Sequence, residues 1–347
     1  MLLARTCVRR ERATCVRTLV RVICVLAGGV GAARFARGLR AVHDPRDIAL
    51  VVNTADDVVV HGLYVSPDVD TVTYTLANAI DPVRGWGLRD ETWRAMESLR
   101  RFAQVTPNES VTVNEWFNLG DADLATHMYR TARRAEGATA TVVAAEIARA
   151  FGVAERIVPM TDDPVATRVR LAADCAAGTK GTWISFQEYF VRHRHDIGVD
   201  AIDVVGADTA RTDAPALIAD AEIVVIAPSN PLVSIGPIRA LRGVDAALSA
   251  RREDVVAVSP IVGGKALKGP ADRMMRELGL EPSVGGVARL YAPVCATLVI
   301  DERDADCVDD VRAAGMDCVV TDTVMTDPDA AARLARTTLA ATQQDGA

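Results

Sequence analysis

Short apolar runs of four or five residues recur along this chain and alternate with segments of helical spacing. The first run, at 22–26, is biased toward β-branched residues, and the second lies at 48–52. Such runs, when bounded by turn residues, predict strands that are buried on both faces of a parallel sheet. Their alternation with helices predicts an α/β fold with a doubly wound, mostly parallel sheet. Further strands of this sheet are expected at 202–205, 223–227, 255–258, 297–300 and 318–320.

Helix-start signals separate several of these strands. Ser66 followed by Pro67 predicts an N-cap and a first helical position. Asp121 is expected to cap the helix that follows it. Further helical insertions and a last helix are predicted at 84–104, 141–151 and 328–341.

One segment departs from this alternation of strands and helices. At 165–171 apolar and polar residues alternate, which predicts a half-exposed strand. A turn at 174–178 and a return strand at 181–190 complete the prediction of an antiparallel insert near 165–196. The histidines and charged residues at 193–196 have neither helical nor zinc-site spacing, so we interpret them as a solvated loop.

Composition sets broad limits on the class of protein. The chain has 347 residues, 50% of them apolar, and a net charge of −7. No apolar run approaches the length of a membrane span, and the acidic balance does not indicate a nucleic-acid or anionic-membrane partner. We expect a single α/β domain at 20–342. Residues 1–19 carry five arginines and no apolar core, and we interpret them as a disordered extension or one read from a misassigned start.

The cysteines indicate the compartment. Seven cysteines are scattered without a CxxC motif, and their number is odd. This usage is typical of reduced thiols, so we expect a cytoplasmic protein with no metal or redox role for its cysteines. His127 has no cysteine near it and is interpreted as structural.

A glycine-rich turn follows the first strand. Gly28, Gly29 and Gly31 precede a helix expected to begin at Ala32, and Arg34 lies in its first turn. A strand, a glycine turn and a helix N-terminus form an anion site, to which arginine can add a bidentate phosphate contact. The dinucleotide fingerprint requires glycine where Arg34 stands, and no P-loop string occurs. A phosphate site is therefore predicted, with a tight turn that binds no ligand as the alternative.

Polar residues also follow the second strand. Asn53, Asp56 and Asp57 come directly after it, where open α/β sheets bind ligands, although an ordinary polar turn would contain the same residue types. Asp68 and Asp70 lie in the first turn of the next predicted helix. There they either stabilise the helix dipole or bind a substrate hydroxyl or a metal.

Two long loops rich in glycine, proline and serine follow later strands. One contains Ser229 and Asn230, and the other contains Lys265 and Lys268. Only three of the 39 basic residues are lysines. A compact ammonium near phosphate oxygens is one reason to retain lysine, and chance is the alternative.

The chemistry of these parts favours phosphoryl or nucleotidyl transfer. Backbone amides and cations stabilise charge on phosphates, carboxylates hold Mg²⁺ together with substrate phosphates, and one carboxylate can orient an attacking hydroxyl. No Ser-His-Asp order, nucleophile elbow or zinc motif is present. We assign catalysis to Asp56, Asp57 and Asp162, and the metal to Asp56 and Asp162. Phosphate or nucleotide binding is assigned to Gly28, Gly29, Gly31, Arg34, Ser229, Asn230 and Lys265.

Long strings of the chain resemble, in the same order, the 2-phospho-L-lactate transferase family over residues 20–340. They are AGGVGAARFARGL, VVNTADD, YVSPDVDTVTYTLA, GWGLRDETW, NLGDADLATHMYR, PMTDDPVATRV, WISFQEYFVR, APSNPLVSIGPI and VSPIVGGKALKGPADRMM. The resemblance implies an enzyme of coenzyme F-420 biosynthesis. Such an enzyme transfers a phospholactyl group from lactyl-2-diphospho-5′-guanosine to the deazaflavin Fo (7,8-didemethyl-8-hydroxy-5-deazariboflavin), giving coenzyme F-420-0 and GMP.

The resemblance also implies Mg²⁺ dependence, a Rossmann-like core and a homodimer. Carried over by motif, Asp70 is implied to contact Fo, and Asn118 is implied to be the second Fo contact. Asn118 stands where many family members have lysine. Arg34 replaces the usual lysine of the glycine-loop helix and preserves its charge.

Two alternatives stay open. A non-catalytic regulatory protein that binds a nucleotide sugar is implied by a related family with the same glycine loop, whereas GWGLRDETW and WISFQEYF favour the transferase. A nicotinamide oxidoreductase is disfavoured by Arg34. The sequence leaves open whether the donor carries lactate or a related three-carbon acid, which aspartate binds the metal, and how guanine is recognised.

Overall fold

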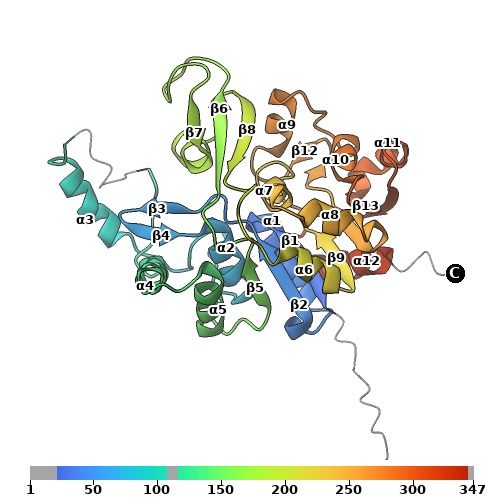
Figure 1. Ribbon diagram of the computed structural model, residues 1–347, viewed down its shortest axis with the longest axis horizontal. Helices are drawn as coiled ribbons and strands as arrows, with labels where there is room; N and C mark the ends of the chain where they lie inside the picture. The colour runs from blue at the N-terminus through green and yellow to red at the C-terminus, as the bar shows by residue number, and fades with distance from the viewer. Residues whose placement is uncertain (1–21, 108–115, 343–347) are drawn as a thin grey trace, which may run out of the picture.

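The central sheet of this α/β protein is parallel (Figure 1). The computed structural model describes residues 22–107 and 116–342, and the predicted extension at 1–19 lies outside them. The strands follow the order β14-β13-β10-β9-β1-β2-β5, and every pairing is parallel. All but the two edge strands are buried at every residue, as the apolar runs predict. The strands are β1 (Ile23–Ala27), β2 (Ile48–Val52), β5 (Arg156–Pro159), β9 (Ile223–Ile226), β10 (Val255–Val258), β13 (Thr297–Asp301) and β14 (Asp317–Thr321).

The strand order reverses beside β1. From β1 the chain proceeds to β2 and β5 on one side, and it later returns to β9 on the other side and continues to β10, β13 and β14. The carboxyl ends of β1 and β9 therefore flank the point where an open α/β sheet binds its ligands.

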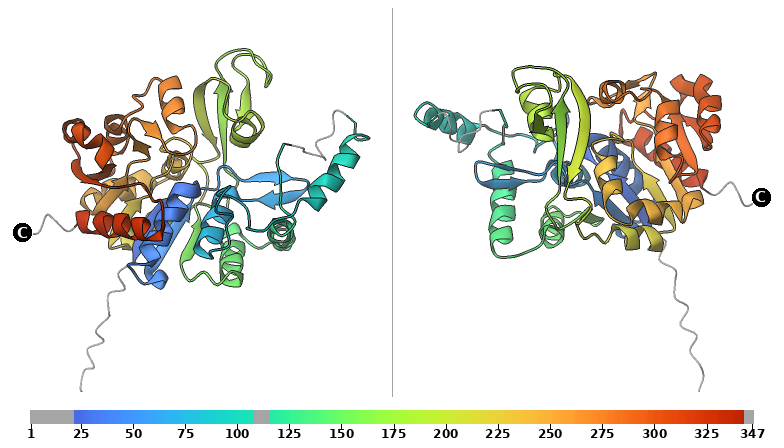
Figure 2. Two further views of the ribbon diagram at one scale, coloured as in Figure 1. Left: turned by 180° about the vertical axis from the view of Figure 1, so that it is seen from behind. Right: turned by 45° about the horizontal axis from the view of Figure 1, so that its top comes forward.

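Helices cover both faces of the sheet, because side chains alternate along each strand. Ile23 and Val25 of β1 face a core formed with α1 (Gly29–Arg40), α2 (Pro67–Leu76), α5 (Ala140–Ala150) and α12 (Pro328–Ala341). Figure 2 shows α1 and α12 side by side on this face. Cys24 and Leu26 face the opposite core, which is formed with α6 (Ala214–Asp220), α7 (Ile235–Ala240), α8 (Val244–Ser249), α9 (Ala271–Glu277), α10 (Val284–Tyr291) and α11 (Val308–Ala313).

Smaller units project from this core (Figure 1). An antiparallel sheet has the order β7-β6-β8, with β6 (Ala166–Leu171), β7 (Trp183–Ser185) and β8 (Val199–Val205). The hairpin of β3 (Val58–Val60) and β4 (Leu63–Val65) packs with α3 (Arg94–Ala103) and α4 (Asp123–Ala135). A second hairpin, β11 (Ile261–Val262) with β12 (Lys265–Ala266), follows β10. Short 3₁₀ or π turns occupy Pro45–Asp47, Glu188–Arg192, Arg252–Asp254 and Glu302–Cys307.

One strand predicted for the central sheet is wrong, and another strand of that sheet was not predicted. The run at 202–205 belongs to β8, which pairs antiparallel with β6 and not with the central sheet. The reason lies in its acidic residues, since Asp200 and Asp203 form ion pairs with Arg170 and Arg168 across the small sheet. The central sheet instead contains β5, a short edge strand that ends in proline and that the sequence pattern did not reveal.

The predicted return strand at 181–190 is also too long. Strand β7 ends at Ser185, and a helical turn replaces the rest. Phe186, Tyr189 and Phe190 are spaced as on a helix, and their rings contact one another. Helical spacing of aromatic side chains therefore overrides the extended conformation at this point.

The helix predicted at 84–104 is shorter, and its cap differs from the prediction. Helix α3 begins at Arg94, and Asp121 caps it by accepting hydrogen bonds from the amides of Arg94 and Ala95 at 3.1 and 3.0 Å. Glu91 caps α4 in the same way, by accepting hydrogen bonds from the amides of Ala122 and Asp123 at 2.9 and 2.8 Å. The two helix starts are thus capped reciprocally, and the prediction that Asp121 caps the helix following it is wrong.

Two further observations concern the described residues only. In these ranges no helix combines the length and apolar character needed to cross a bilayer. The cysteines there are free thiols, in agreement with the prediction of reduced cysteines: Cys24, Cys175, Cys295, Cys307 and Cys318.

Candidate active site

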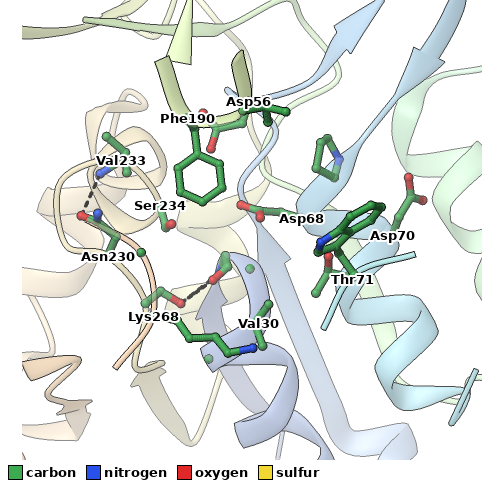
Figure 3. Close-up of a pocket in the computed structure, with 18 of the residues that line it drawn as sticks. Val30, Asp56, Asp68, Asp70, Thr71, Phe190, Asn230, Val233, Ser234 and Lys268 are labelled. Atoms are coloured by element: carbon green, nitrogen blue, oxygen red, sulfur yellow. Dashed lines mark hydrogen bonds between the residues drawn. The ribbon is translucent and has the colours of Figure 1, made fainter. Parts of the chain in front are cut away.

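A cavity of about 670 Å³ lies at the carboxyl ends of the central strands, beside the point where the strand order reverses. Its walls include the turn after β1 and the segments after β2, β9, β10 and β14 (Figure 3). The antiparallel sheet and the segments flanking α3 contribute further side chains. This volume is typical of small-molecule sites.

The glycine turn forms the first turn of α1, which begins at Gly29 and not at Ala32 as predicted. Gly28 is the N-cap, and Gly29 has a φ of +68°, a left-handed value that favours glycine. A Cβ at Gly31 would lie 2.1 Å from the carbonyl oxygen of Pro228, so only glycine lets α1 approach the loop after β9. The positive end of the α1 dipole therefore faces the cavity.

Ser229 and Asn230 line the cavity, but backbone groups engage their polar atoms. Ser229 Oγ donates to the Gly28 carbonyl at 2.7 Å and accepts from the Gly28 amide at 3.3 Å. Asn230 Oδ1 accepts from the amides of Leu232 and Val233 at 2.9 and 3.4 Å (Figure 3). These bonds hold the glycine turn against the loop after β9, and a direct phosphate contact from either side chain stays a prediction.

Two cations line the cavity near the glycine turn, Arg34 of α1 and Lys268 of the loop after β12. Burial, together with the charge of Arg34, lowers the pKa of the Lys268 ammonium. Lys265, which the sequence analysis selected from the same loop, is exposed, as Lys268 is, but it lies on β12 and is not among the lining residues. The structure thus brings Lys268, and not Lys265, to the cavity.

Two carboxylates, one of them against the glycine turn, share one side-chain amide. Asn53 Nδ2 donates to Asp56 Oδ2 at 3.1 Å and to Asp68 Oδ2 at 3.0 Å. Burial and the nearby charge of Asp68 raise the pKa of Asp56 well above its ordinary value, and burial raises the pKa of Asp68 to about 6. Carboxylates this close favour a shared proton or a cation between them.

The chemistry of this pair fits Mg²⁺. Magnesium usually takes one or two carboxylates, and waters and substrate phosphates complete its shell. Asp56 Oδ1 is buried and has no hydrogen-bond partner among the described residues, which leaves it as a ligand atom. Within those residues no group of three or more His, Cys, Asp or Glu side chains could hold an ion, so phosphate oxygens would have to complete the site.

The other two acids assigned to catalysis lie elsewhere. Asp57 accepts a hydrogen bond from the Ser66 hydroxyl at 2.5 Å and is not among the lining residues. Ser66 is therefore occupied with Asp57, and its side chain does not cap α2. Asp162 accepts from the Thr141 amide at 2.7 Å, at the start of α5, and is also outside the lining. The predicted metal pair of Asp56 and Asp162 is not brought together, and Asp68 takes the place beside Asp56.

Both residues assigned to the acceptor line the cavity. Asp70 lies in the first turn of α2, is 5% exposed, and forms an ion pair with Arg130 of α4. Asn118 is exposed at the rim, next to Trp116 and Phe117, which line the cavity too. The structure therefore brings Asp70 and Asn118 to one site, which their separation in sequence does not show.

The sequence analysis missed the contribution of the antiparallel insert. Phe186 and Phe190 stack with ring centroids 5.5 Å apart, and both line the cavity with Gln187. Gln187 Nε2 donates to the backbone oxygen of Asp56 at 3.0 Å. Figure 3 shows Phe190 projecting toward Asp56 and Ser234. The helical spacing of the two phenylalanines is the signal that points to this arrangement.

Comparisons with known proteins identify the family and agree with this picture of the fold. A family model described as 2-phospho-L-lactate transferase CofD matches residues 23–342. Proteins named phosphoenolpyruvate transferase from Kitasatospora aureofaciens and Streptomyces coelicolor are each 40% identical, over 93% and 91% of this chain and 98% and 97% of their own. One of the same name from Mycobacterium tuberculosis is 39% identical over 90% of this chain and 96% of its own.

Solved structures extend the comparison to the fold. A crystal structure of a UPF0052-family protein from Bacillus halodurans superposes with a TM-score of 0.57 at 13% identity, covering 92% of this chain and 98% of its own. A second crystal structure of that protein has a TM-score of 0.58. At this identity the likeness shows the fold alone, which is the doubly wound α/β fold predicted from the sequence.

Proposed function

This chain belongs to the 2-phospho-L-lactate transferase family, and from this premise we propose that it transfers a phosphorylated three-carbon acid from a guanosine diphosphate ester to the deazaflavin Fo. The terminal hydroxyl of Fo forms a bond to the phosphorus that carries the acid. The bond between that phosphorus and the bridging oxygen breaks on the opposite side, and GMP leaves with the electron pair. The hydroxyl proton passes to a carboxylate or to solvent.

We propose enolpyruvate as the acid. The relatives at 40% identity carry the name phosphoenolpyruvate transferase, and this observation favours the enolpyruvyl form of the donor. Phospholactate is the second candidate, because the family description names it. The two acids differ at the carbon that bears the phosphate oxygen, which is planar in enolpyruvate and tetrahedral in lactate.

The polarity of the cavity carries the proposal. The start of α1, Arg34 and Lys268 line the cavity together with the carboxylates of Asp56 and Asp68, and Asp68 lies against the glycine turn. A diphosphate bound between them meets backbone amides and cations that stabilise the charge moving onto GMP. Mg²⁺, when held by Asp56 and Asp68, supplies further neutralisation of the phosphates.

The acceptor occupies the aromatic part of the cavity in this proposal. Asp70 accepts a hydrogen bond from the attacking hydroxyl and orients it. Trp86, Trp116 and Phe190 offer flat apolar surfaces for the deazaflavin ring and exclude water that would otherwise hydrolyse the donor. Asn118 contacts Fo at the rim. The expected homodimer and the expected cytoplasmic location stay predictions.

The test combines the full chain with Fo, Mg²⁺ and either the enolpyruvyl or the lactyl donor, and follows GMP release and product mass. We expect GMP and product in equal amounts, with faster turnover of the enolpyruvyl donor. Asp70→Asn is expected to lose turnover of Fo, while Asp309→Asn, at an exposed position on α11, keeps it. Tight binding of either donor without turnover would overturn the proposal and favour the nucleotide-sugar-binding alternative.

A further inference from the structure

Helices α2 and α4 meet in a cluster of buried polar side chains beside the cavity. Asp70 and Tyr74 come from α2, and Asp123, His127 and Arg130 come from α4. Each is at most 8% exposed. The hydroxyl of Tyr74 donates to Asp123 Oδ1 at 2.6 Å, so contacts cross between the helices. Burying this many polar groups is costly unless they are paired, which makes the pairing pattern informative.

The pairing assigns a hydrogen-bond role to His127. Arg130 Nη1 lies 3.0 Å from His127 Nδ1. A guanidinium has no acceptor, so Arg130 donates and Nδ1 accepts. Nε2 of the same ring lies 3.3 Å from Asp123 Oδ1. His127 therefore acts toward Arg130 as an acceptor.

The same guanidinium holds only one oxygen of Asp70. Arg130 Nη2 donates to Asp70 Oδ1, and Nη1 is shared between His127 and the backbone oxygen of Tyr64, which lies 3.3 Å away. Asp70 Oδ2 is buried and has no hydrogen-bond partner in the described part of the chain, and His127 Nδ1 lies 3.8 Å from it. Asp70 and His127 both line the cavity.

An arginine and a carboxylate otherwise favour a bidentate contact, in which two parallel N–H groups bind both oxygens. Here His127 and Tyr64 occupy the second guanidinium nitrogen, so this contact does not form. An ion pair serving stability alone would gain from engaging both oxygens. The observed arrangement leaves one oxygen of a buried carboxylate, in a residue that lines the cavity, without a hydrogen bond.

We propose that Arg130 and His127 are positioning residues for Asp70: His127 keeps Arg130 from binding both oxygens, and Oδ2 thereby stays available for the attacking hydroxyl of the acceptor. This inference rests on the function proposed above. Neither residue touches the reacting atoms in this scheme. Both act through the orientation of one carboxylate.

The test compares His127→Phe, which removes the acceptor, with His127→Asn, whose side-chain oxygen can replace Nδ1. In His127→Phe the guanidinium is free to rotate onto both Asp70 oxygens. We expect kcat/KM for Fo to fall about 10- to 100-fold, the cost of losing a hydrogen bond to a charged group, while the KM for the donor is unchanged. His127→Asn is expected to recover most of this loss. Equal losses in both variants, or losses that follow thermal stability, would overturn the proposal.

A second variant and a second readout cover the remaining outcomes. Arg130→Lys keeps the charge but cannot reach Asp70 and His127 with one planar group, so it is expected to lower kcat/KM for Fo even where His127→Phe does not fold. If the wild-type chain does not turn over Fo, the proposed function fails on its own. The crystal structure of His127→Phe then decides the inference: a bidentate contact between Arg130 and Asp70 supports it, and an unchanged single contact overturns it.

Discussion

Burial and hydrogen bonding have opposite effects on the pKa of Asp68. Burial raises its pKa to about 6, while the amide groups of Asn53 and Gly29 act in the opposite direction. Asp56 lies close enough to share the same Asn53 amide, and its pKa is raised as well. Two negative charges on this pair therefore destabilise the folded protein unless a cation or a proton binds between them. The pair is thus suited to binding a cation and does not contribute to stability.

Asp68→Asn is expected to stabilise the metal-free protein by about 1–3 kcal/mol above about pH 6. The folded carboxyl binds its proton more tightly than the unfolded chain, whose pKa is about 3.9. Because the folded state holds more protons in this window, the free energy of unfolding falls as pH rises from about 4 to about 6, and asparagine removes that fall. Thermal unfolding at several pH values without divalent ions measures the effect.

Asp309→Asn serves as the matched control for this experiment, because it removes an exposed carboxylate far less constrained by neighbours. It is expected to leave the pH dependence unchanged. A lower melting temperature for Asp68→Asn throughout the window would show that the hydrogen bonds from Asn53 and Gly29 outweigh the burial of the charge.

Single residues could be predicted where topology determines their place. The glycines at 28–31, Asp56 and Ser229 each follow a central strand, and all of them line the cavity. Lys265 and Lys268 lie on one loop, and the hairpin of β11 and β12 decides which of them reaches the site. That register depends on tertiary packing, so spacing alone could not select Lys268 over Lys265.

At the scale of elements, the reciprocal caps of α3 and α4 connect the rim to the body of the protein. Asp121 caps α3, and Glu91 caps α4. Residues before Glu91 and before Asp121, including Trp86 and Asn118, line the cavity. A cap in this region therefore stabilises a helix and also positions two lining segments.

Asp121→Ala is expected to destabilise the protein by about 0.5–2 kcal/mol, the usual cost of an N-cap. It is also expected to raise the KM for Fo with little change in the KM for the donor. The segments that carry Trp86 and Trp116 lose the hydrogen bonds that Asp121 makes, whereas the glycine turn keeps all of its contacts. Steady-state kinetics with each substrate varied in turn measures both. The hydroxyl of Thr139 caps α5 by accepting from the Val142 amide at 3.3 Å. Thr139→Ala is therefore the control, because it is expected to lower stability without changing either KM. A rise in the donor KM of Asp121→Ala would contradict the assignment of this rim to Fo.

Elements could be predicted where one physical signal dominates. Strands β1, β2, β9 and β10 are apolar at every position because helices cover both faces of the sheet, and the sequence pattern shows this directly. Strand β8 misled the prediction because Ile202, Val204 and Val205 suggest a strand of the central sheet, while Asp200 and Asp203 pair with arginines of β6. The turn after β7 forms where Phe186, Tyr189 and Phe190 have helical spacing, and the prediction of a strand through Phe190 did not take this competing signal into account.

At the scale of the whole molecule, the cavity joins the two halves of the sheet. The glycine turn and the acids after β2 come from one side of the reversal, and the loops after β9 and β10 come from the other. A ligand in the cavity therefore contacts segments that lie far apart in the sequence. Such a ligand should stabilise the whole chain.

GDP with Mg²⁺ is expected to stabilise the wild-type protein, by about 2.7 kcal/mol at a ligand concentration of about 100 times Kd. Lys268→Met is expected to reduce the shift in melting temperature, because the ammonium lies in the cavity, whereas Lys265→Met keeps the full shift. Thermal unfolding with and without ligand and chelator measures these shifts. Equal shifts in the two variants would show that the Lys268 ammonium does not meet the diphosphate.

The ends of the segment that carries α3 lie side by side. The amide of Asp121 donates to the carbonyl of Thr92 at 2.9 Å, so the chain leaves and rejoins the body at adjacent points. The entropy of closing such a loop changes slowly with its length. The segment can therefore lengthen, shorten or be exchanged without moving a strand of the central sheet. The acceptor rim is thus carried by a loop whose length the sheet does not constrain, whereas the donor side is built on strand ends and on Gly31, where a side chain would clash with Pro228.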